Sequence, residues 1–562
     1  MQAGSKRQTA TTTVRDLVAQ RIESALGSAA VAGRLPSGAG LPPIEVVRSS
    51  VPEHGDFATN VALKLAGPLR TAPREIAQAL VEQLTADDGR LIERAEVAGP
   101  GFVNVWLLAA RVEEAVDAIR AAGEAYGRAP LSDSRRINVE FVSANPTGPL
   151  TIGNARGAFV GDLLCRVLEA VGHDVTREYY FNDSGTQVRL LGESVIATRA
   201  GRPVPEDGYR GGYIADLAAE LPPELADEAE GDPAAGAWSV GRWASHGIRT
   251  GIEASLERLG VHFDVWKSEA TLHADGWVAR AIDRLREAGH LYEQDGALWF
   301  RSTALGDDKD RVVIRSNGEP TYFAADIGYL VEKFGRDFDD LLYIWGADHH
   351  GTVARLRNAA QAMGFQRESV QVLLVAWVRF VRDGREISMS KRAGEFITLD
   401  ELLAEVGVDA ARWFFASRAP STGIDFDIEL ARRQSSDNPV YYVQYAHARI
   451  SSILRKAAQE GLSPADSLSG QLAGDPVALE LAKELLRLPD VVRDAAAARE
   501  TQSVTAYATG LATMFHAFYR DRRVVDAADR STSAARLALV DAVRTTLAGA
   551  LTLLGISAPE SM

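Results

Sequence analysis

The sequence predicts a Rossmann-type α/β domain at the centre of the chain, with a smaller α/β module before it and an all-helical bundle after it. Three observations lead to this prediction. Apolar strand-like runs alternate with helical segments through the middle of the chain, short strands and helices mix in the first 128 residues, and helical periodicity continues from residue 429 to the end. A chain of 562 residues is long enough for three or four domains.

The predicted domain boundaries follow these changes of pattern. Residues 1–12 form a polar tail, residues 13–128 the N-terminal α/β module, residues 129–428 the central domain with an insertion around 186–290, and residues 429–562 the helical bundle. The insertion is expected because the stretch 201–243 is rich in proline, glycine and acidic residues.

In the N-terminal module, helices are expected from Val14 and over residues 73–84, and a turn followed by a strand over residues 99–106. Phe102 and Asn104 lie on this strand, where they could face a ligand. The ordinary alternation of side chains along a strand explains both residues more simply.

A strand, a turn-rich loop and a helix follow one another in the next part of the chain. The apolar run 137–142 predicts the strand, residues 143–153 form the loop, and the helix is expected from Asn154 onward. Free N–H groups and a partial positive charge at the start of a helix suit a nucleotide triphosphate. Tight packing of the loop glycines is the alternative explanation.

Two further apolar strands are expected to end in polar residues. One leads to Asn182 and Asp183, and the strand 341–345 leads to Gly-Ala-Asp-His-His-Gly at 346–351. Ligands of a parallel, doubly wound sheet bind at the carboxyl ends of its strands, so these polar groups are expected to line a crevice. A metal site at the two adjacent histidines is not expected, because neighbouring side chains of an extended chain point to opposite faces.

Two other segments carry side chains suited to an ionic ligand. Tyr322 and Asp326 stand four residues apart on a predicted helix, so a phenol and a carboxylate could converge on a cation; an intrahelical contact beside a solvated acid is the alternative. After an expected strand at 372–381, a glycine-flanked loop carries Lys391 and Arg392. These cations could clamp a triphosphate, and a solvated turn explains them equally well.

The C-terminal bundle is expected to begin at Asn438, which caps a helix whose first residue is proline. The tyrosines that follow, Tyr441, Tyr442 and Tyr445, are expected in the core rather than on a base-stacking platform. Several arginines beside Tyr519 could nevertheless face a nucleic acid.

The composition limits the class of protein. Apolar residues make up 46% and charged residues 24% of the chain, as in ordinary globular proteins. The 61 basic and 76 acidic residues give a net charge of −15, which argues against a purely electrostatic nucleic-acid binder but not against a local tRNA or nucleotide site. The single cysteine, Cys165, excludes a disulfide within the chain and a multi-cysteine zinc site, and it is expected to be buried.

The first 14 residues lack the apolar segment of a signal peptide. The longest apolar runs are too short to cross a bilayer. We therefore expect a cytoplasmic protein that does not contact a membrane.

Five motifs together resemble those of the arginyl-tRNA synthetases, a family of class I aminoacyl-tRNA synthetases. In the order of the family they are residues 139–149, 180–183, 345–351, 389–394 and 438–449. The resemblance extends from about residue 14 to the C-terminus, and such a set is far more specific than one glycine motif.

The resemblance implies an arginine–tRNA ligase, which activates L-arginine with ATP to arginyl-adenylate and then esterifies the terminal ribose of tRNA(Arg). In this family the first step usually needs bound tRNA. The N-terminal module is implied to contact the tRNA, and the helical domain to bind the anticodon. Mg²⁺ is expected only as the counterion of ATP, no protein-bound metal is expected, and the protein is expected to be a monomer.

The resemblance also implies roles for individual residues. The implied arginine-binding residues are Glu140, Ser143, Asn145, Tyr322, Asp326 and Asp348. The implied ATP-binding residues are Gly153, Gly346, Asp348, Met389, Ser390 and Lys391, and the catalytic ones are Thr151, Asn154 and Lys391. The implied tRNA-binding residues are Phe102, Asn104, Tyr442 and Arg449.

Two departures from the family motifs concern ATP. The His-Ile-Gly-His signature is here Thr151-Ile152-Gly153-Asn154, and Ser388 replaces the first lysine of the Lys-Met-Ser-Lys-Ser loop. Thr151 and Asn154 can donate neutral hydrogen bonds to phosphate but not charge-assisted ones. Losing one transition-state donor outright costs about 2.7–4 kcal/mol, and partial replacement should cost less.

The main hypothesis is therefore a working ligase with an altered ATP site. The same departures allow two alternatives. One is a noncatalytic paralogue that binds tRNA or arginine, and the other is a paralogue that supplies activated arginine to another pathway.

Overall fold

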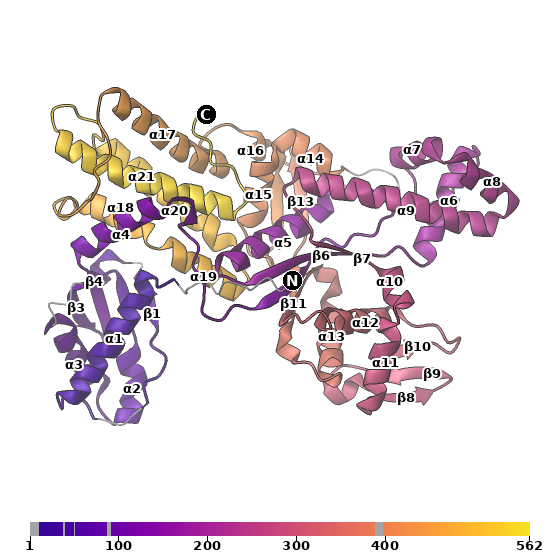
Figure 1. The fold of residues 1–562 in the computed structure, drawn as a ribbon, viewed down its shortest axis with the longest axis horizontal. Helices are drawn as coiled ribbons and strands as arrows, with labels where there is room; N and C mark the ends of the chain where they lie inside the picture. Colours follow the sequence, from indigo (N-terminus) through magenta and orange to yellow (C-terminus); the bar gives the residue numbers. More distant parts are fainter. Residues whose placement is uncertain (1–10, 37–39, 50, 87–90, 388–396) are drawn as a thin grey trace, which may run out of the picture.

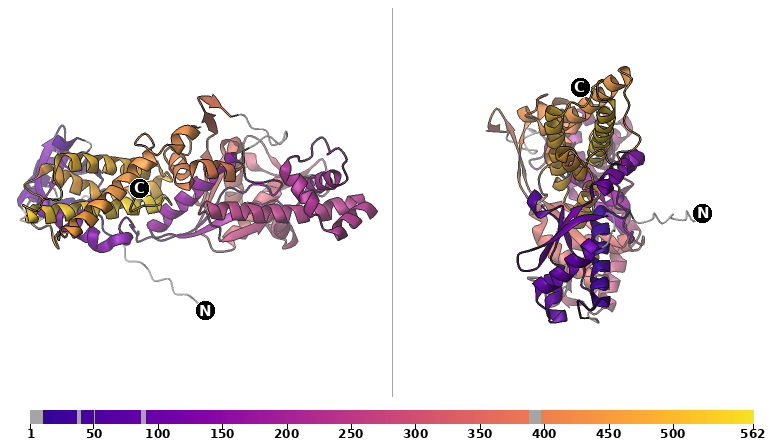
Figure 2. Two further views of the ribbon diagram at one scale, coloured as in Figure 1. Left: turned by 90° about the horizontal axis from the view of Figure 1, so that it is seen from above. Right: turned by 90° about the vertical axis from the view of Figure 1, so that its left-hand side faces the viewer.

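The computed structural model of the chain describes residues 11–36, 40–49, 51–86, 91–387 and 397–562. An α/β domain with a parallel sheet lies at the centre, between a helical lobe at one end of the molecule and a helical bundle at the other (Figure 1). The N-terminal module lies beside the bundle, as both views in Figure 2 show. The predicted fold class is confirmed.

The N-terminal module is an antiparallel sheet of order β1-β2-β4-β3 with helices packed on it. Its elements are α1 (Val14–Val31), β1 (Val46–Arg48), β2 (Phe57–Thr59), α2 (Val61–Leu69), α3 (Pro73–Ala86), β3 (Ile92–Ala98) and β4 (Phe102–Leu107). A capping box between Thr13 and Asp16 starts α1, and its apolar stripe, which includes Val18 and Ile22, is fully buried.

The central sheet has five parallel strands in the order β12-β11-β5-β6-β7. Their bounds are β5 (Arg136–Glu140), β6 (Asp174–Phe181), β7 (Val265–Ser268), β11 (Asp340–Gly346) and β12 (Val370–Val375), and α5 (Ile152–Ala170) connects β5 to β6. The chain runs from β5 toward one edge of the sheet and later returns to the other side of β5. The carboxyl end of β5 is therefore a topological switch point, where ligands of such sheets bind.

Two separate excursions leave this sheet: the first lies inside the expected insertion at 186–290, and the second begins inside it and continues beyond residue 290. The first is a helical lobe of α6 (Thr186–Arg199), α7 (Gly212–Glu220), α8 (Pro223–Gly231) and α9 (Pro233–Arg258). The chain then returns to the sheet as β7, so the expected insertion is not one unit. Asp232 caps α9 and a proline fills its first position, which explains why the proline-rich stretch 201–243 begins a long helix.

The second excursion joins β7 to the remaining strands of the sheet. It contains α10 (Glu269–Ala274), α11 (Trp277–Glu287), an antiparallel sheet of β8 (Leu291–Gln294), β9 (Ala297–Phe300) and β10 (Arg311–Ile314), and then α12 (Tyr322–Phe334). Between β11 and β12 lies α13 (His350–Ala362).

The strand expected at 372–381 is in fact two strands in different sheets. β12 ends at Val375, and β13 (Val378–Arg382) pairs with β14 (Arg385–Glu386) and β15 (Ile424–Asp427). The apolar run is continuous in sequence, so the break at Ala376 and Trp377 is set by tertiary pairing. The helices that follow are α14 (Leu399–Val406), α15 (Val408–Ala416) and α16 (Ile428–Arg432).

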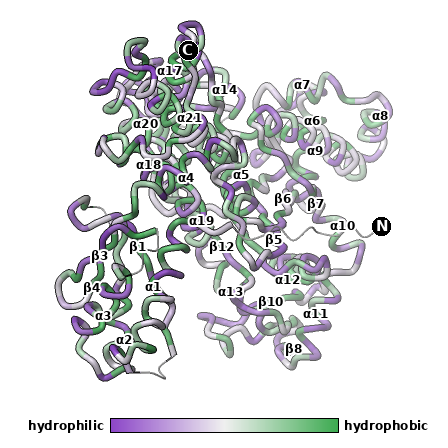
Figure 3. Tube along the Cα trace, turned by 60° about the vertical axis from the view of Figure 1, so that its left-hand side comes forward, coloured by the Kyte–Doolittle hydropathy of each residue, from purple (hydrophilic) through white to green (hydrophobic). Residues whose placement is uncertain are grey.

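The C-terminal bundle consists of α17 (Pro439–Gln459), α18 (Pro476–Leu485), α19 (Leu488–Ala498), α20 (Gln502–Asp521) and α21 (Arg530–Leu553). Asn438 caps α17 as predicted. Hydrophobic and hydrophilic residues alternate along these helices in Figure 3, as expected for amphipathic helices around a shared core. The helix α4 (Ala109–Ala122) leaves the N-terminal module and packs on α18 and α21.

Within the part of the chain that the structure describes, no helix is long and apolar enough to span a membrane. Cys165 on α5 is fully buried, as expected, and its burial raises the pKa of the thiol.

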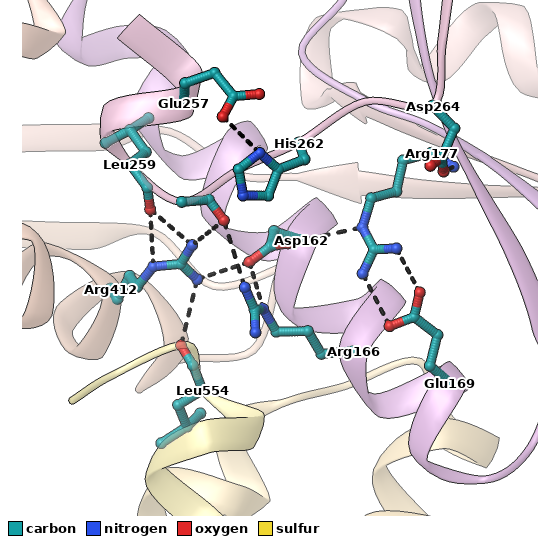
Figure 4. Close-up of polar contacts among 11 residues, drawn as sticks. Asp162, Arg166, Glu169, Arg177, Glu257, Leu259, His262, Asp264, Arg412 and Leu554 are labelled. Carbon is teal, nitrogen blue, oxygen red and sulfur yellow. Dashed lines mark hydrogen bonds and ion pairs between the residues drawn. The ribbon is translucent and has the colours of Figure 1, made fainter. Parts of the chain in front are cut away.

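A buried ionic cluster joins the central domain to the lobe and the bundle (Figure 4). Asp162 of α5 accepts hydrogen bonds from Nη1 of Arg412 and from Nε of Arg166, each at 2.7 Å. Arg412 also donates to the carbonyl oxygens of Leu259, at the end of α9, and of Leu554, at the end of α21. Asp162 and Arg412 are both 1% exposed, so water cannot replace either partner.

We predict that Asp162→Ala lowers the free energy of unfolding by about 3–5 kcal/mol, because it leaves the buried charge of Arg412 without its counterion. Thermal unfolding followed by circular dichroism measures the change. The matched control is Asp425→Ala, which removes the half-exposed partner of Arg379 and should cost less than about 1 kcal/mol. Equal shifts for the two variants would contradict the structural role of the buried pair.

Candidate active site

The carboxyl ends of three neighbouring strands bring the expected site residues to one edge of the sheet. β5 leads into residues 141–151, which we call the signature loop, and β6 leads into Asn182 and Asp183. β11 leads into Gly346 and Asp348. The predicted crevice at this edge is therefore formed by segments far apart in the sequence.

The signature loop begins with a strained backbone. Val142 and Ser143 have φ angles of 65° and 40°, in the left-handed region that residues other than glycine rarely adopt, least of all a β-branched one. Such conformations cost about 1–3 kcal/mol each and gather at functional sites. The Ser143 hydroxyl holds the turn in place by donating to Glu140 Oε1 at 3.3 Å and accepting from the Tyr180 backbone N–H at 3.2 Å. Neither position is a glycine, so the sequence did not indicate this turn.

Thr151 and Asn154 are bonded to each other where α5 begins. Oδ1 of Asn154 accepts from the backbone N–H of Thr151 at 3.1 Å and from its hydroxyl at 3.2 Å. Thr151 is only 6% exposed, so its hydroxyl is committed to the helix cap. The Nδ2 amide of Asn154 makes no hydrogen bond within the described ranges. Of the two expected phosphate donors, Asn154 is thus the available one.

Glu140, at the end of β5, forms a buried ion pair that was not predicted from the sequence. Its Oε2 lies 2.6 Å from Nζ of Lys333, which is fully buried on α12. The ammonium also lies over the rings of Tyr329, at 4.3 Å, and Tyr343, at 4.2 Å. Burial raises the pKa of Glu140 and Lys333 opposes that shift. The spacing of Asp326, Tyr329 and Lys333 places all three on one helix face, and this signal could have identified Lys333.

Asp326 shares this pocket with other carboxylates. Burial, reinforced by the nearby carboxylates of Glu140 and Glu269, raises the pKa of Asp326 to about 7, while Arg355 opposes the shift. Glu269 accepts a hydrogen bond from the Tyr180 hydroxyl at 2.8 Å. Among the described residues, the acids of this pocket outnumber the buried ammonium of Lys333, which favours a cationic ligand. Tyr322, one turn before Asp326, is 66% exposed at the start of α12.

The remaining site residues lie around this pocket. Asn145 donates through Nδ2 to Oε1 of Gln187 on α6 at 2.8 Å. The Asp348 side chain is 82% exposed. A Cβ atom at Gly346 would lie 2.4 Å from Oδ1 of Asp348, so only glycine fits there without moving the carboxylate. Gly153 lies in the first turn of α5.

Met389, Ser390 and Lys391 lie outside the described residues. The segment that follows them is bonded to the signature loop: the Ile152 N–H donates to the Ile397 carbonyl at 3.2 Å, and the Leu399 N–H donates to the Leu150 carbonyl at 2.9 Å. An isolated bridge pairs Thr151 with Thr398. The described segment 397–399, which follows the expected lysine loop in sequence, therefore lies beside the start of α5. Over the described ranges, no three or more His, Cys, Asp or Glu side chains are arranged to hold a metal.

The expected tRNA contacts lie far from this pocket, in the terminal domains. Tyr442 packs against His516, with ring centroids 4.9 Å apart, and the Arg449 guanidinium lies over Tyr445 and Tyr519. Tyr445 and Tyr519 are 37% and 38% exposed, so the prediction that Tyr445 lies in the core is wrong. In the N-terminal module, Phe102 is 41% exposed and Asn104 only 8%. Their contacts with tRNA remain predictions.

Sequence comparisons assign a family to each part of the chain. Residues 13–107 match the arginyl tRNA synthetase N terminal domain, residues 115–199 and 242–418 the catalytic domain of the class I (R) tRNA synthetases, and residues 443–562 the DALR anticodon binding domain. The chain belongs to the arginyl-tRNA synthetases. This confirms the resemblance, and with it an ATP-dependent aminoacyl-tRNA ligase of class I.

Curated relatives are similar to this synthetase over more than nine-tenths of its length. The arginine–tRNA ligase of Geobacillus kaustophilus is 44% identical and covers 97% of this chain and 99% of its own. That of Moorella thermoacetica is 47% identical and covers 91% and 92%. The fold matches the Thermus thermophilus arginyl-tRNA synthetase with a TM-score of 0.77 and 24% identity, over 97% of this chain and 100% of that one.

We predict that the arginine affinity of this synthetase depends on pH through Asp326. The pKa of about 7 keeps this carboxyl largely neutral at pH 6 and largely ionised at pH 8. A guanidinium binds the ionised form, so affinity is present above pH 7 and should fall about tenfold as the pH drops from 8 to 6. The KM for arginine at each pH measures this change.

Asp326→Asn is the control for this prediction. It should raise the KM for arginine and flatten its pH dependence, with little effect on the KM for ATP. A variant that raises both KM values equally, or that keeps the pH dependence of the parent, would rule out Asp326 as the titrating contact.

Proposed function

We propose that this synthetase carries out both steps of arginine–tRNA ligation, with the pocket of Glu140, Asp326 and Glu269 reading the arginine side chain and Asn154 contacting the ATP phosphates. The observation that carries the proposal is the set of carboxylates gathered at the switch point of the sheet, beside the start of α5. A planar guanidinium with five N–H donors suits several carboxylate oxygens better than a compact ammonium does.

The arginine would be oriented by groups on both sides of the pocket. Asp326 supplies a carboxylate that forms no ion pair within the described residues, Glu140 shares its charge with Lys333, and Tyr322 would close the exposed side. Asn145 and Ser143 would hold the backbone end of the amino acid, because both lie on the signature loop that follows β5. In this arrangement the arginine carboxylate would lie toward α5, where the ATP phosphates are expected.

The phosphate side rests on the start of α5 and on the exposed group at the end of β11. In the first turn, the backbone N–H groups of Ile152 and Asn154 already donate to carbonyl oxygens. Within the described residues, the Gly153 N–H and the Asn154 side-chain amide therefore stay available to donate to phosphate oxygens. Gly153 lets the phosphates approach the backbone, and Asp348 with Gly346 would contact the ribose or the arginine. Lys391, with Met389 and Ser390, would supply the positive charge that the signature sequence lacks, and ATP would arrive with Mg²⁺ as its counterion.

The remaining proposals concern the partners. tRNA(Arg) would bind across the N-terminal module, through Phe102 and Asn104, and the helical bundle, through Tyr442 and Arg449. The boundaries 13–128, 129–428 and 429–562 are the proposed functional division. We further propose a monomeric protein of the cytoplasm.

Arginine-dependent ATP–pyrophosphate exchange with and without tRNA(Arg), followed by charging of the tRNA, tests the function. We expect exchange that requires or is stimulated by tRNA, and charging with arginine. If tRNA binds but neither exchange nor charging occurs, the protein is not a working ligase. Exchange without charging would instead support a role in supplying activated arginine elsewhere.

We predict that Asn154→Asp abolishes most exchange activity without unfolding the protein. The aspartate keeps an oxygen that accepts from Thr151, and a negative charge is favourable at a helix N-terminus, so the melting temperature should not fall. The new carboxylate would repel the ATP phosphates and remove a donor, which should lower kcat by about 100-fold or more. Exchange kinetics and thermal unfolding give the two measurements. Retention of full activity would show that Asn154 does not contact the phosphates.

A further inference from the structure

The helical lobe of α6 to α9 touches the signature loop at two separate points. Nδ2 of Asn145 donates to Gln187, in the first turn of α6, at 2.8 Å. The hydroxyl of Tyr213, in the first turn of α7, donates to the carbonyl oxygen of Thr147 at 3.0 Å. A side chain added at Gly148 would lie 3.3 Å from the Tyr213 hydroxyl, so the loop and this tyrosine are already in close contact.

The lobe also holds the segment that pairs with the signature loop. Asp400, in the first turn of α14, accepts from the Ser255 hydroxyl at 2.7 Å and from Nη2 of Arg258 at 2.7 Å, both on the last turns of α9. The neighbouring Leu399 donates its N–H to Leu150 of the signature loop. The lobe therefore supports the loop directly, at Asn145 and Thr147, and indirectly, through Asp400.

These supports belong to one rigid unit because α6 and α9 pack backbone against backbone. A Cβ atom at Gly192 of α6 would lie 1.9 Å from the carbonyl oxygen of Ala237 on α9. A Cβ atom at Gly241 of α9 would in turn lie 2.1 Å from the carbonyl oxygen of Val188 on α6. Only glycine fits at both positions, and the two helices cannot slide independently without a clash. Figure 1 shows α9 extending from beside α15 and β13 into the lobe.

We propose that the helical lobe sets the position of the signature loop, with Tyr213 and Gln187 as positioning residues for the two substrates. Gln187 acts through Asn145 on the amino-acid side, and Tyr213 acts through Thr147 on the stretch that leads to the start of α5. The loop needs such support because Val142 and Ser143 hold an unfavourable backbone conformation. This inference rests on the proposed roles of Asn145 and Asn154.

Loss of each contact should change a different kinetic parameter. Gln187→Leu should raise the KM for arginine about 3- to 10-fold, the equivalent of one neutral hydrogen bond, with the KM for ATP unchanged. Tyr213→Phe should lower kcat of ATP–pyrophosphate exchange by a similar factor, with the KM for arginine unchanged. A merely structural role would change both parameters alike in both variants.

The matched control is Tyr209→Phe, which removes a hydroxyl from the same lobe. Within the described parts of the chain, this hydroxyl makes no hydrogen bond to the signature loop. It should leave kcat and both KM values as in the parent protein. An effect of Tyr209→Phe equal to that of Tyr213→Phe would overturn the proposal.

Amide hydrogen exchange gives a readout that does not depend on activity. Tyr213→Phe should speed exchange of the amides in residues 141–151 several-fold, and Tyr209→Phe should not. If the parent protein shows no ATP–pyrophosphate exchange but the loop amides respond in this way, the proposed function fails and the support by the lobe stands. Unchanged amide exchange in Tyr213→Phe, together with unchanged kinetics in both loop-support variants, would overturn the inference.

Discussion

The helix α5 depends on two buried charged side chains that fix it to the rest of the molecule. Near its middle, Asp162 binds Arg412, which reaches the ends of α9 and α21. Near its start, Arg156, 1% exposed, donates to the carbonyl oxygens of Ala376 and Ala419, between the central sheet and β15. Water cannot substitute for these contacts, so the helix N-terminus has one position relative to the strands. The position of the site at that N-terminus therefore depends on the contacts of Asp162 and Arg156.

The negative charge in the amino-acid pocket is only partly neutralised by the protein. Lys333 neutralises part of the acidity of Glu140 and is held by two aromatic faces, so it contributes charge without reaching the crevice. Within the described residues Asp326 forms no ion pair, and its burial, reinforced by the neighbouring acids, raises its pKa to about 7. A bound guanidinium would supply the missing counterion. Arginine recognition and the protonation state of Asp326 are therefore coupled in the proposed site.

The changed signature sequence has a structural consequence as well as a chemical one. Thr151 and Asn154 form a helix cap, which two histidines could not form in the same way. In this chain a capped helix start therefore stands where the family motif has charge-assisted phosphate donors. The proposed support from the helical lobe would also fix the start of α5, because the lobe contacts the loop that precedes this cap. In the proposed site, geometry at the phosphate side compensates for part of the lost charge.

The sequence by itself determined the family, the three-part architecture, the strand–loop–helix unit around residue 140 and the helix face of Asp326, because local periodicity and ordered motifs carry this information. It did not determine that β12 and β13 are separate strands, that residues 186–290 leave the sheet twice, or that Val142 and Ser143 adopt left-handed conformations. The sequence also did not indicate the contacts of Lys333, Gln187 and Tyr213, because each reaches the site from a helix distant in sequence. Only tertiary structure decides such contacts, because strand pairing, burial and the partner of a polar group depend on what the rest of the chain places beside it.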